Sequence, residues 1–296
     1  MAEQGGFVPI RRLTVFGVGL IGGSLTLALK AAGAVVEVTG VGRSLSSLKL
    51  AREHGLIDRM TDNAAEALEG AEVVMLAMPV GQMDSVMRAI APHLRPGVLV
   101  TDAGSTKQDV VSLMRQHLGA HLRDCVPGHP VAGAELSGPL AARADLYQRR
   151  NVVLTPLAES DPAGVQRIAA MWRQCGAQVR SMTAAEHDAI FAAVSHLPHL
   201  LAYALVDMIA GRDNAGQLFD FAASGFRDFT RIAGSSPEMW RDIALANREA
   251  LLAELDAYLV QVGQLRAALQ RGDGAALEAM FAQARSARQD WLDRLR

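Results

Sequence analysis

Apolar runs in the first half of the chain alternate with stretches in which apolar residues recur at helical spacing. Short continuous apolar runs are typical of strands buried in a parallel sheet, and the stretches between them are typical of covering helices. The pattern therefore predicts an α/β Rossmann-type, doubly wound sheet. The predicted strands cover residues 13–17, 35–41, 71–79, 97–102, 151–155 and 178–180, and the predicted helices include 82–91, 108–117 and 163–175.

The pattern changes after about Thr183, where the strand signals stop. Long stretches with helical spacing follow, over residues 184–209 and 237–270. We therefore expect two domains, a nucleotide-binding domain over 1–182 and an all-helical domain over 183–296. The second domain is more apolar than one small domain needs, which predicts a homodimer, although a bundle within one chain is the alternative. The leucines near helical spacing are Leu251, Leu252, Leu255, Leu259 and Leu265.

The composition of the chain argues against several classes of protein. The chain has 296 residues, of which half are hydrophobic and a fifth charged, so a large core is available. The longest mostly apolar stretch, 189–206, contains Ser195, His196, Pro198 and His199, which argues against a membrane span. The first nine residues carry no signal-peptide pattern, and two cysteines are too few for a disulfide framework. A net charge of −2 without a basic stripe argues against nucleic acid, so we expect a soluble cytoplasmic protein.

A glycine-rich turn follows the first predicted strand. Gly17, Gly19 and Gly22 form a GxGxxG pattern between that strand and an apolar helix, with Leu20 and Ile21 in between. In this context the first glycine permits the turn, the second lets the backbone approach a pyrophosphate, and the third lets the helix pack closely on the sheet. The helix N-terminus attracts the phosphates. The motif predicts a dinucleotide site, and the alternative is a glycine-rich turn without a ligand.

The end of the second strand bears on which dinucleotide binds. Glu37 lies early in that strand, too far from its carboxyl end to hold the ribose hydroxyls as an acidic residue would for NAD. The strand end instead reads Gly42-Arg43-Ser44, which offers a cation and a hydroxyl donor to a 2′-phosphate. The sequence therefore favours NADP over NAD, and the alternative for Arg43 is a solvated surface arginine.

Further polar or special residues follow other strand ends. In a doubly wound sheet, ligands bind outside the carboxyl ends of the strands, so we expect Met78, Pro79, Asp102 and His129 to converge on the nicotinamide. His129 lies between Pro127 and Pro130, which stiffen the backbone around it. A firmly held histidine that titrates near neutral pH suits a general base, while the simpler alternative is a loop histidine that caps a turn.

Six blocks in this order resemble the prephenate and arogenate dehydrogenases of tyrosine biosynthesis. They lie at residues 17–24, 102–107, 128–133, 195–199, 225–233 and 240–243. The resemblance implies a Rossmann domain followed by a helical domain that forms the dimer. It also implies the oxidative decarboxylation of a cyclohexadienol, in which hydride passes to NAD(P), the hydroxyl proton passes to a base and carbon dioxide leaves.

The resemblance implies a role for individual residues. His129 matches the family's catalytic base, and Ser105 matches the serine that hydrogen-bonds the substrate hydroxyl. Arg231 matches the arginine that binds a substrate carboxylate, for which a planar guanidinium is suited. Alternatives for the last two are an N-cap of the helix over 108–117 for Ser105 and an ion pair with Asp228 for Arg231.

Lesser roles are expected for other residues. By the resemblance, His196 and His199 face the active site, and at least one orients the substrate; the alternative is two histidines satisfied within a helical core. No third ligand accompanies them, so we expect no metal site. Glu135 is predicted to gate the entrance or pair with an arginine there. The remaining expectations are a minor role for Arg227, a weaker candidacy for Ser195, and support from Asp228 and Trp240.

Two other functions are weighed against this one. A β-hydroxyacid dehydrogenase also joins a Rossmann domain to a helical one, but that family typically has a catalytic lysine in its helical half. The chain after Thr183 contains no lysine. A non-catalytic dinucleotide sensor would need the glycine loop but not His129, Ser105 and Arg231 together. Prephenate and arogenate both remain open as the small-molecule substrate.

Overall fold

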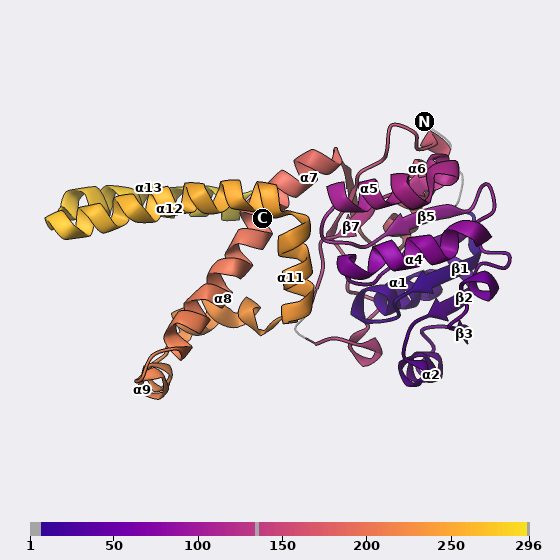
Figure 1. Cartoon of the computed structure of the whole chain (residues 1–296), viewed down its shortest axis with the longest axis horizontal. Helices are drawn as coiled ribbons and strands as arrows, with labels where there is room; N and C mark the ends of the chain where they lie inside the picture. Colours follow the sequence, from indigo (N-terminus) through magenta and orange to yellow (C-terminus); the bar gives the residue numbers. More distant parts are fainter. Residues whose placement is uncertain (1–6, 134–135, 295–296) are drawn as a thin grey trace. The chain divides into compact units, whose positions relative to one another are not determined.

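A six-stranded parallel sheet forms the centre of the first part of the chain (Figure 1). The computed structural model describes residues 7–133 and 136–294. The strand order is β3-β2-β1-β4-β5-β6, so the order of the strands reverses between β1 and β4, which is where sheets of this kind bind their ligands. The strands are β1 (Ile10–Phe16), β2 (Val35–Val41), β3 (Arg59–Thr61), β4 (Val73–Leu76), β5 (Leu99–Asp102) and β6 (Cys125–Val126).

Both faces of this sheet are buried. On β4, Val73 and Met75 belong to one hydrophobic cluster, whereas Val74 and Leu76 belong to another. The first cluster includes side chains of α1 and α6, and the second includes side chains of α4 and α5, so helices cover each face and the predicted doubly wound fold is confirmed. These helices are α1 (Leu20–Ala31), α2 (Leu45–Glu53), α3 (Ala64–Ala67), α4 (Met83–Ile90), α5 (Gln108–His117) and α6 (Pro162–Gln174).

A second, smaller sheet carries His129. The predicted strands near 151–155 and 178–180 exist, but they belong to a separate three-stranded sheet with the order β7-β8-β9. β6 is followed at once by Pro127, which has no N–H to continue the parallel ladder, and β7 then pairs antiparallel with β8. His129, expected at a loop or strand end, therefore lies within a strand. The strands are β7 (Gly128–Pro130), β8 (Asn151–Leu154) and β9 (Gln178–Ser181).

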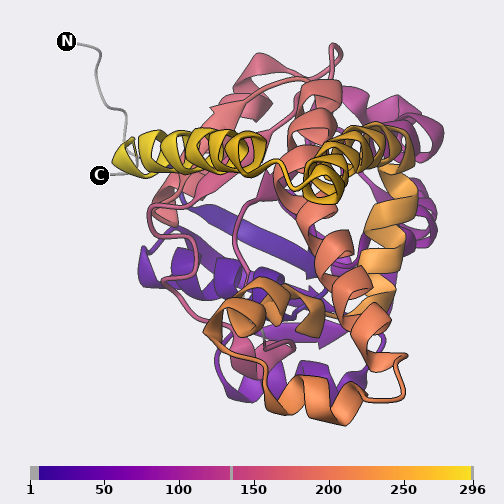
Figure 2. The same ribbon diagram turned by 90° about the vertical axis from the view of Figure 1, so that its left-hand side faces the viewer.

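The described chain after Thr183 is helical, as predicted. Thr183 caps α7 in a capping box with Glu186, which defines where the helical part begins. The predicted helix 184–209 contains a π-helical turn, and the predicted helix 237–270 is interrupted at Asn247. Figure 2 shows α8 and α11 in front of the parallel strands. The elements are α7 (Ala184–Phe191), the π-helical turn (Ala192–His196), α8 (Leu197–Ala210), α9 (Ala215–Asp220), α10 (Ser224–Thr230), the short helix η6 (Arg231–Gly234) and α11 (Pro237–Ala246).

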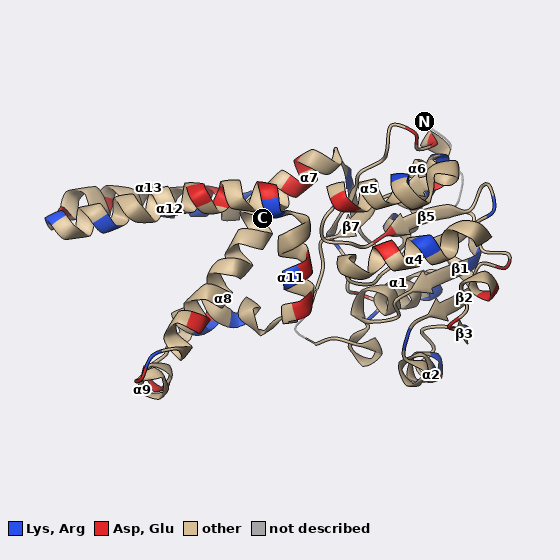
Figure 3. Cartoon of the chain, in the orientation of Figure 1, with Lys and Arg blue, Asp and Glu red and all other residues tan. Residues whose placement is uncertain are grey.

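The continuous helix Ala184–Ala210 is long and apolar enough to cross a membrane by length and composition alone. Figure 3 shows that most of α8 lacks charged residues. However, the same helix carries Asp188 and His196, which are 1% exposed and make hydrogen bonds to other parts of the protein. These two positions of the helix are therefore built into the polar network of the protein.

Residues 249–296 form a separate compact unit. It contains most of α12 (Arg248–Arg271) and α13 (Gly274–Asp293), which are joined through Gly272 with a positive φ of 64°. Many of its large apolar side chains are exposed in the single chain. They include Leu252, Leu259, Val260, Leu269, Phe281 and Trp291, each more than half exposed.

Candidate active site

The glycine turn between β1 and α1 has the geometry of a dinucleotide cradle. Gly17 has a φ of +90°, and a Cβ there would lie 2.4 Å from the carbonyl oxygen of Ala77. A Cβ on Gly22 would lie 2.2 Å from the Gly17 oxygen, so both positions require glycine. A Cβ on Gly19 would meet nothing within 4 Å, which leaves that side open to a ligand. No side chain caps the N-terminus of α1, so its N–H groups suit a pyrophosphate.

The end of β2 presents a guanidinium and a hydroxyl group to solvent. Arg43 and Ser44 are exposed, and the Ser44 hydroxyl caps α2 by accepting a hydrogen bond of 3.2 Å from the Ser47 N–H. Glu37 forms ion pairs with Arg12 at 3.5 Å and Arg59 at 3.4 Å, away from the strand end. The acidic residue in this strand is therefore engaged elsewhere, as its position in the sequence predicted.

The ends of β4 and β5 lie at the same edge of the sheet. Met78 and Pro79 follow β4 and are half-buried. Asp102 ends β5 and is fully enclosed: its carboxylate accepts hydrogen bonds from the N–H groups of Gly104 at 2.7 Å and Gly128 at 3.0 Å. This enclosure leaves only the backbone of Asp102 for a contact with a cofactor.

A buried lysine completes the surroundings of Asp102. The Lys107 ammonium is fully buried, pairs with the Asp102 carboxylate, and donates to the Gly128 carbonyl at 2.9 Å. A buried charge needs such a partner and the additional hydrogen bond, because desolvation is costly. Lys107 and Asp102 both make hydrogen bonds to Gly128, so this ion pair connects the end of β5 to β7. Sequence analysis did not single out Lys107, although it ends the 102–107 block.

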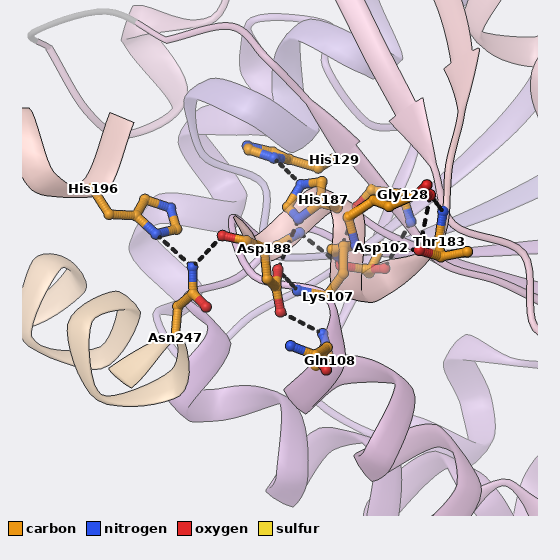
Figure 4. A network of polar contacts seen from close by, with 12 residues as sticks. Asp102, Lys107, Gln108, Gly128, His129, Thr183, His187, Asp188, His196 and Asn247 are labelled. Carbon is orange, nitrogen blue, oxygen red and sulfur yellow. Dashed lines mark hydrogen bonds and ion pairs between the residues drawn. The ribbon is translucent and has the colours of Figure 1, made fainter. Parts of the chain in front are cut away.

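His129 on β7 forms part of a polar chain (Figure 4). Its Nδ1 lies 2.8 Å from Nε2 of His187 on α7, and the Phe191 ring packs 4.8 Å from its own ring. Burial lowers the pKa of His129 well below 6.5, and the nearby His187 and Lys107 lower it further. The half-buried His129 is therefore neutral near pH 7, as a general base requires.

His187 and Asp188 continue this chain. Nδ1 of His187 lies 2.8 Å from Oδ1 of Asp188, and the two Asp188 oxygens accept hydrogen bonds of 2.8 Å from the N–H groups of Lys107 and Gln108. Although burial raises the pKa of Asp188, the hydrogen bonds from His187, Gln108 and Lys107 lower it below its usual value overall. Asp188, rather than Ser105, thus caps α5. Sequence analysis missed both residues, whose only signal was an adjacent His–Asp pair in an apolar helix.

His196 and His199 lie on either side of the start of α8 and both contact Trp240. His199 stacks on the Trp240 ring with centroids 3.6 Å apart, and the His196 centroid lies 6.0 Å away. Nδ1 of His196 accepts a 3.0 Å hydrogen bond from Asn247, which also donates to the Asp188 carbonyl. Burial lowers the pKa of His196 to about 4. Asn247 is a further residue that sequence analysis did not identify.

Comparison of the chain with known proteins identifies its family. The model of the prephenate dehydrogenase nucleotide-binding domain matches residues 25–181, and that of the prephenate dehydrogenase dimerization domain matches residues 183–283. The chain belongs to the prephenate dehydrogenase family. The resemblance on which the sequence analysis relied is thereby confirmed, and the chain is an oxidoreductase.

Individual relatives cover nearly the whole chain. It is 37% identical to cyclohexadienyl dehydrogenase from Zymomonas mobilis over 94% of this chain and 95% of the relative. It is 35% identical to prephenate dehydrogenase from Bacillus subtilis, over 92% and 74% respectively. The crystal structure of A. aeolicus prephenate dehydrogenase in complex with hydroxyphenyl propionate and NAD+ has a TM-score of 0.90 and 31% identity, covering 96% of this chain and 99% of that one.

The remaining predicted site residues of this family member fall around two centres. Burial lowers the pKa of His196, and the backbone of Ser105 opposes that shift, so Ser105 lies beside the His196 ring. Arg231 lies in η6 and is exposed, and its charge lowers the pKa of His199, after the larger effects of burial and of the Ser195 carbonyl are counted. Arg231 therefore joins the centre that contains His199 and Trp240. Arg227 and Asp228 are exposed on α10, and Glu135 lies outside the described residues.

Neither a metal-binding cluster nor a cavity adds to the site among the described residues. Over residues 7–133 and 136–294, no group of three or more His, Cys, Asp or Glu side chains is arranged to hold a metal ion. A cavity of about 730 Å³ opens beside α5 and the start of α7, and its lining includes Arg115, Thr155 and Gln108. No predicted site residue lines this cavity, so the polar chain identifies the site and cavity shape does not.

Proposed function

We propose that this family member oxidises and decarboxylates prephenate to 4-hydroxyphenylpyruvate in L-tyrosine biosynthesis, with hydride transfer to NAD(P). The observation that carries this proposal is a neutral, half-buried His129 next to Gly128, whose N–H is bonded to Asp102 at the end of β5, in the sheet that also carries the glycine turn. The second candidate is arogenate, alone or together with prephenate, and the relative named cyclohexadienyl dehydrogenase favours it. The sequence identities to proteins with the two names are similar.

The proposed mechanism divides the reaction among the chain's own residues. The glycine turn would hold NAD(P), which would supply the acceptor for the hydride that leaves the ring carbon bearing the hydroxyl. Nε2 of His129 accepts the hydroxyl proton while Ser105 orients that hydroxyl through a hydrogen bond. Loss of carbon dioxide from the quaternary carbon on the opposite side of the ring sends the electrons of the broken C–C bond through the dienone to its oxygen, which makes the ring aromatic, and the proton on His129 returns to the phenolate oxygen. Arg231 pairs with a substrate carboxylate, supported by His199, and Glu135 acts at the entrance.

The cofactor contacts are proposed for the glycine turn and for the strand ends beside it. They comprise Gly17, Gly19, Leu20, Ile21, Gly22, Met78, Pro79 and the backbone of Asp102. We propose a preference for NADP over NAD, because Arg43 offers an exposed guanidinium and Ser44 an exposed hydroxyl where a 2′-phosphate would bind. The first turn of α2 adds its N–H groups on the same side.

We further propose a cytoplasmic homodimer formed through the helical part. The matched model is that of a dimerization domain, and the exposed apolar side chains of α12 and α13 supply a surface that a second copy would cover. The proposed boundary between the two domains is at residues 182 and 183, where the capping box starts α7.

A steady-state assay tests the reaction, the substrate and the cofactor together. Prephenate and arogenate are each combined with NAD and NADP, and the reduced cofactor is followed by its absorbance. We expect turnover with prephenate that is faster with NADP. Faster turnover with arogenate would select the second candidate. An absence of turnover in all four combinations, with dinucleotide binding verified separately, would reject the proposed function.

A further inference from the structure

The Asp188 carboxylate controls the proton positions in the polar chain. Oδ1 and Oδ2 of Asp188 each accept a backbone hydrogen bond of 2.8 Å, from Lys107 and Gln108 respectively. A protonated carboxyl could not accept at both oxygens as readily, and the N-terminus of α5 also favours the negative charge. Asp188 is therefore an ionised group that only accepts hydrogen bonds.

This charge fixes the tautomer of His187. Since Oδ1 of Asp188 is an acceptor, Nδ1 of His187 must be the donor in the 2.8 Å bond between them. Burial lowers the pKa of His187, so its ring is neutral and carries a single proton. Nε2 of His187 consequently has a lone pair and can only accept.

The tautomer of His129 follows from that of His187. Nδ1 of His129 lies 2.8 Å from this accepting Nε2, so it must donate. In the neutral ring, the lone pair then lies on Nε2 of His129, which has no hydrogen-bond partner among the described residues and points away from His187 in Figure 4. Phe191 stacks on His187 with centroids 4.4 Å apart and packs on His129, which holds both rings in this relation.

We propose that His187 and Asp188 are positioning residues that place the lone pair of His129 on Nε2, facing the substrate. The inference rests on the proposed function for its consequence, because a base with its proton on Nε2 could not accept the substrate's hydroxyl proton. When the O–H bond breaks, its proton forms a new N–H bond at Nε2, and the Nδ1 proton remains shared with His187. The ionised Asp188 stabilises the resulting imidazolium through His187, as the aspartate does in a serine protease triad.

The direct test is the tautomer of each ring. In the full-length chain labelled with ¹⁵N-histidine, spectra that correlate ring nitrogens with ring C–H protons distinguish a protonated nitrogen from a bare one. Single His129→Asn and His187→Phe variants assign the signals. We expect a protonated Nδ1 and a bare Nε2 on both rings at neutral pH. A proton on Nε2 of His129 in the wild-type protein would overturn the proposal.

The His187→Phe variant links the tautomer to turnover. Phenylalanine keeps the packing on Phe191 but removes the acceptor, so the proton of His129 moves to Nε2. We expect kcat to fall by about 10²–10⁴-fold, with KM and the dinucleotide Kd unchanged. An unchanged kcat would contradict the proposal, and the wild-type spectrum decides it if the variant does not fold.

Asp84→Asn is the matched control. It alters a His–Asp bond of the same 2.8 Å length, formed with His117 between α4 and α5 and outside the site. We expect this variant to keep both the His129 tautomer and kcat. If neither substrate is turned over while the His129 signals are as expected, the proposed reaction fails and the tautomer assignment stands.

Discussion

At the scale of single residues, the protonation state of His129 decides whether the site can act. Its low pKa keeps the ring neutral, and its hydrogen bond to His187 keeps the ring oriented. For His129→Asn we expect kcat to fall by about 10²–10⁴-fold, because the base is lost while the cofactor site is unchanged. Turnover kinetics and a fluorescence titration with the dinucleotide measure the two effects. Normal turnover would remove His129 as the base.

Arg231 is predicted to act through binding and not through chemistry. Its charge influences His199, which stacks on Trp240, so a substrate carboxylate placed there would meet the guanidinium. We expect Arg231→Ala to raise the substrate KM by about tenfold or more, with the dinucleotide Kd unchanged, as for the loss of a charge-assisted hydrogen bond. Arg227→Ala, an exposed arginine on α10, is the control and should have little effect. An unchanged KM would make Arg231 structural.

Arg43 bears on the choice of cofactor alone. Arg43→Ala should weaken NADP binding by about tenfold and leave NAD binding nearly unchanged, because only NADP offers a 2′-phosphate to the guanidinium. Calorimetric titration with each dinucleotide measures the ratio of the two Kd values. Arg52→Ala in the last turn of α2 is the control. Equal losses for both cofactors would reject a phosphate contact.

At the scale of elements, the helix that runs from α7 through the π-helical turn to α8 concentrates buried histidines. His187 and His196 lie on it with lowered pKa values, and His129 packs against it with a lowered pKa as well. The π-helical turn widens the helix just before Pro198, which lacks an N–H for regular helical bonding. The histidines on either side of this turn thereby reach different neighbours, His187 toward β7 and His196 toward α11.

These buried histidines predict an acid-sensitive fold. A histidine whose folded pKa is below its unfolded value of 6.5 contributes stability that is fully present above pH 6.5 and is lost as the pH falls below it. For His196, with a pKa of about 4, the loss at pH 5 is about 2 kcal/mol. Urea unfolding at pH 7.5 and pH 5 measures this change. An equal stability at both values would contradict the prediction.

Two variants separate this effect from the general effect of acid. His196→Gln should show a smaller loss of stability between pH 7.5 and pH 5, because the buried group no longer titrates. His93→Gln removes an exposed histidine and should keep the wild-type loss. A wild-type loss in His196→Gln would assign the acid sensitivity to other groups.

At the scale of the whole molecule, the exposed apolar side chains of α12 predict assembly. Leu252 and Leu259 are 51% and 58% exposed and lie two helical turns apart on α12, so they share a face. The chain mass is 31.5 kDa, and we expect a particle of twice that mass by light scattering after size exclusion. Leu259→Glu should shift it toward the single-chain mass, whereas Gln261→Glu, exposed on the same helix, should not. A monomeric wild-type protein would reject the dimer.

Local sequence patterns are enough to predict the class of fold, the glycine turn and the family. These features depend on local patterns: the GxGxxG spacing between a strand and a helix, and the change from strand to helical periodicity near Thr183. All six predicted strands overlap observed ones, but the two near 151–155 and 178–180 belong to the separate sheet. The hydrophobic pattern of a strand does not predict which of two sheets the strand joins, because strands in either sheet can have the same pattern.

The side chains that support His129 are brought together only by the folding of distant segments. Lys107 and Asp188 are 81 residues apart, and Asn247 lies 51 residues beyond His196, yet hydrogen bonds join each pair. Within an apolar helix, His187 and Asp188 have no sequence pattern that distinguishes a structural pair from a functional one. Their role depends on burial and on the direction of hydrogen bonds from β7 and α5, and both exist only after the segments have packed together.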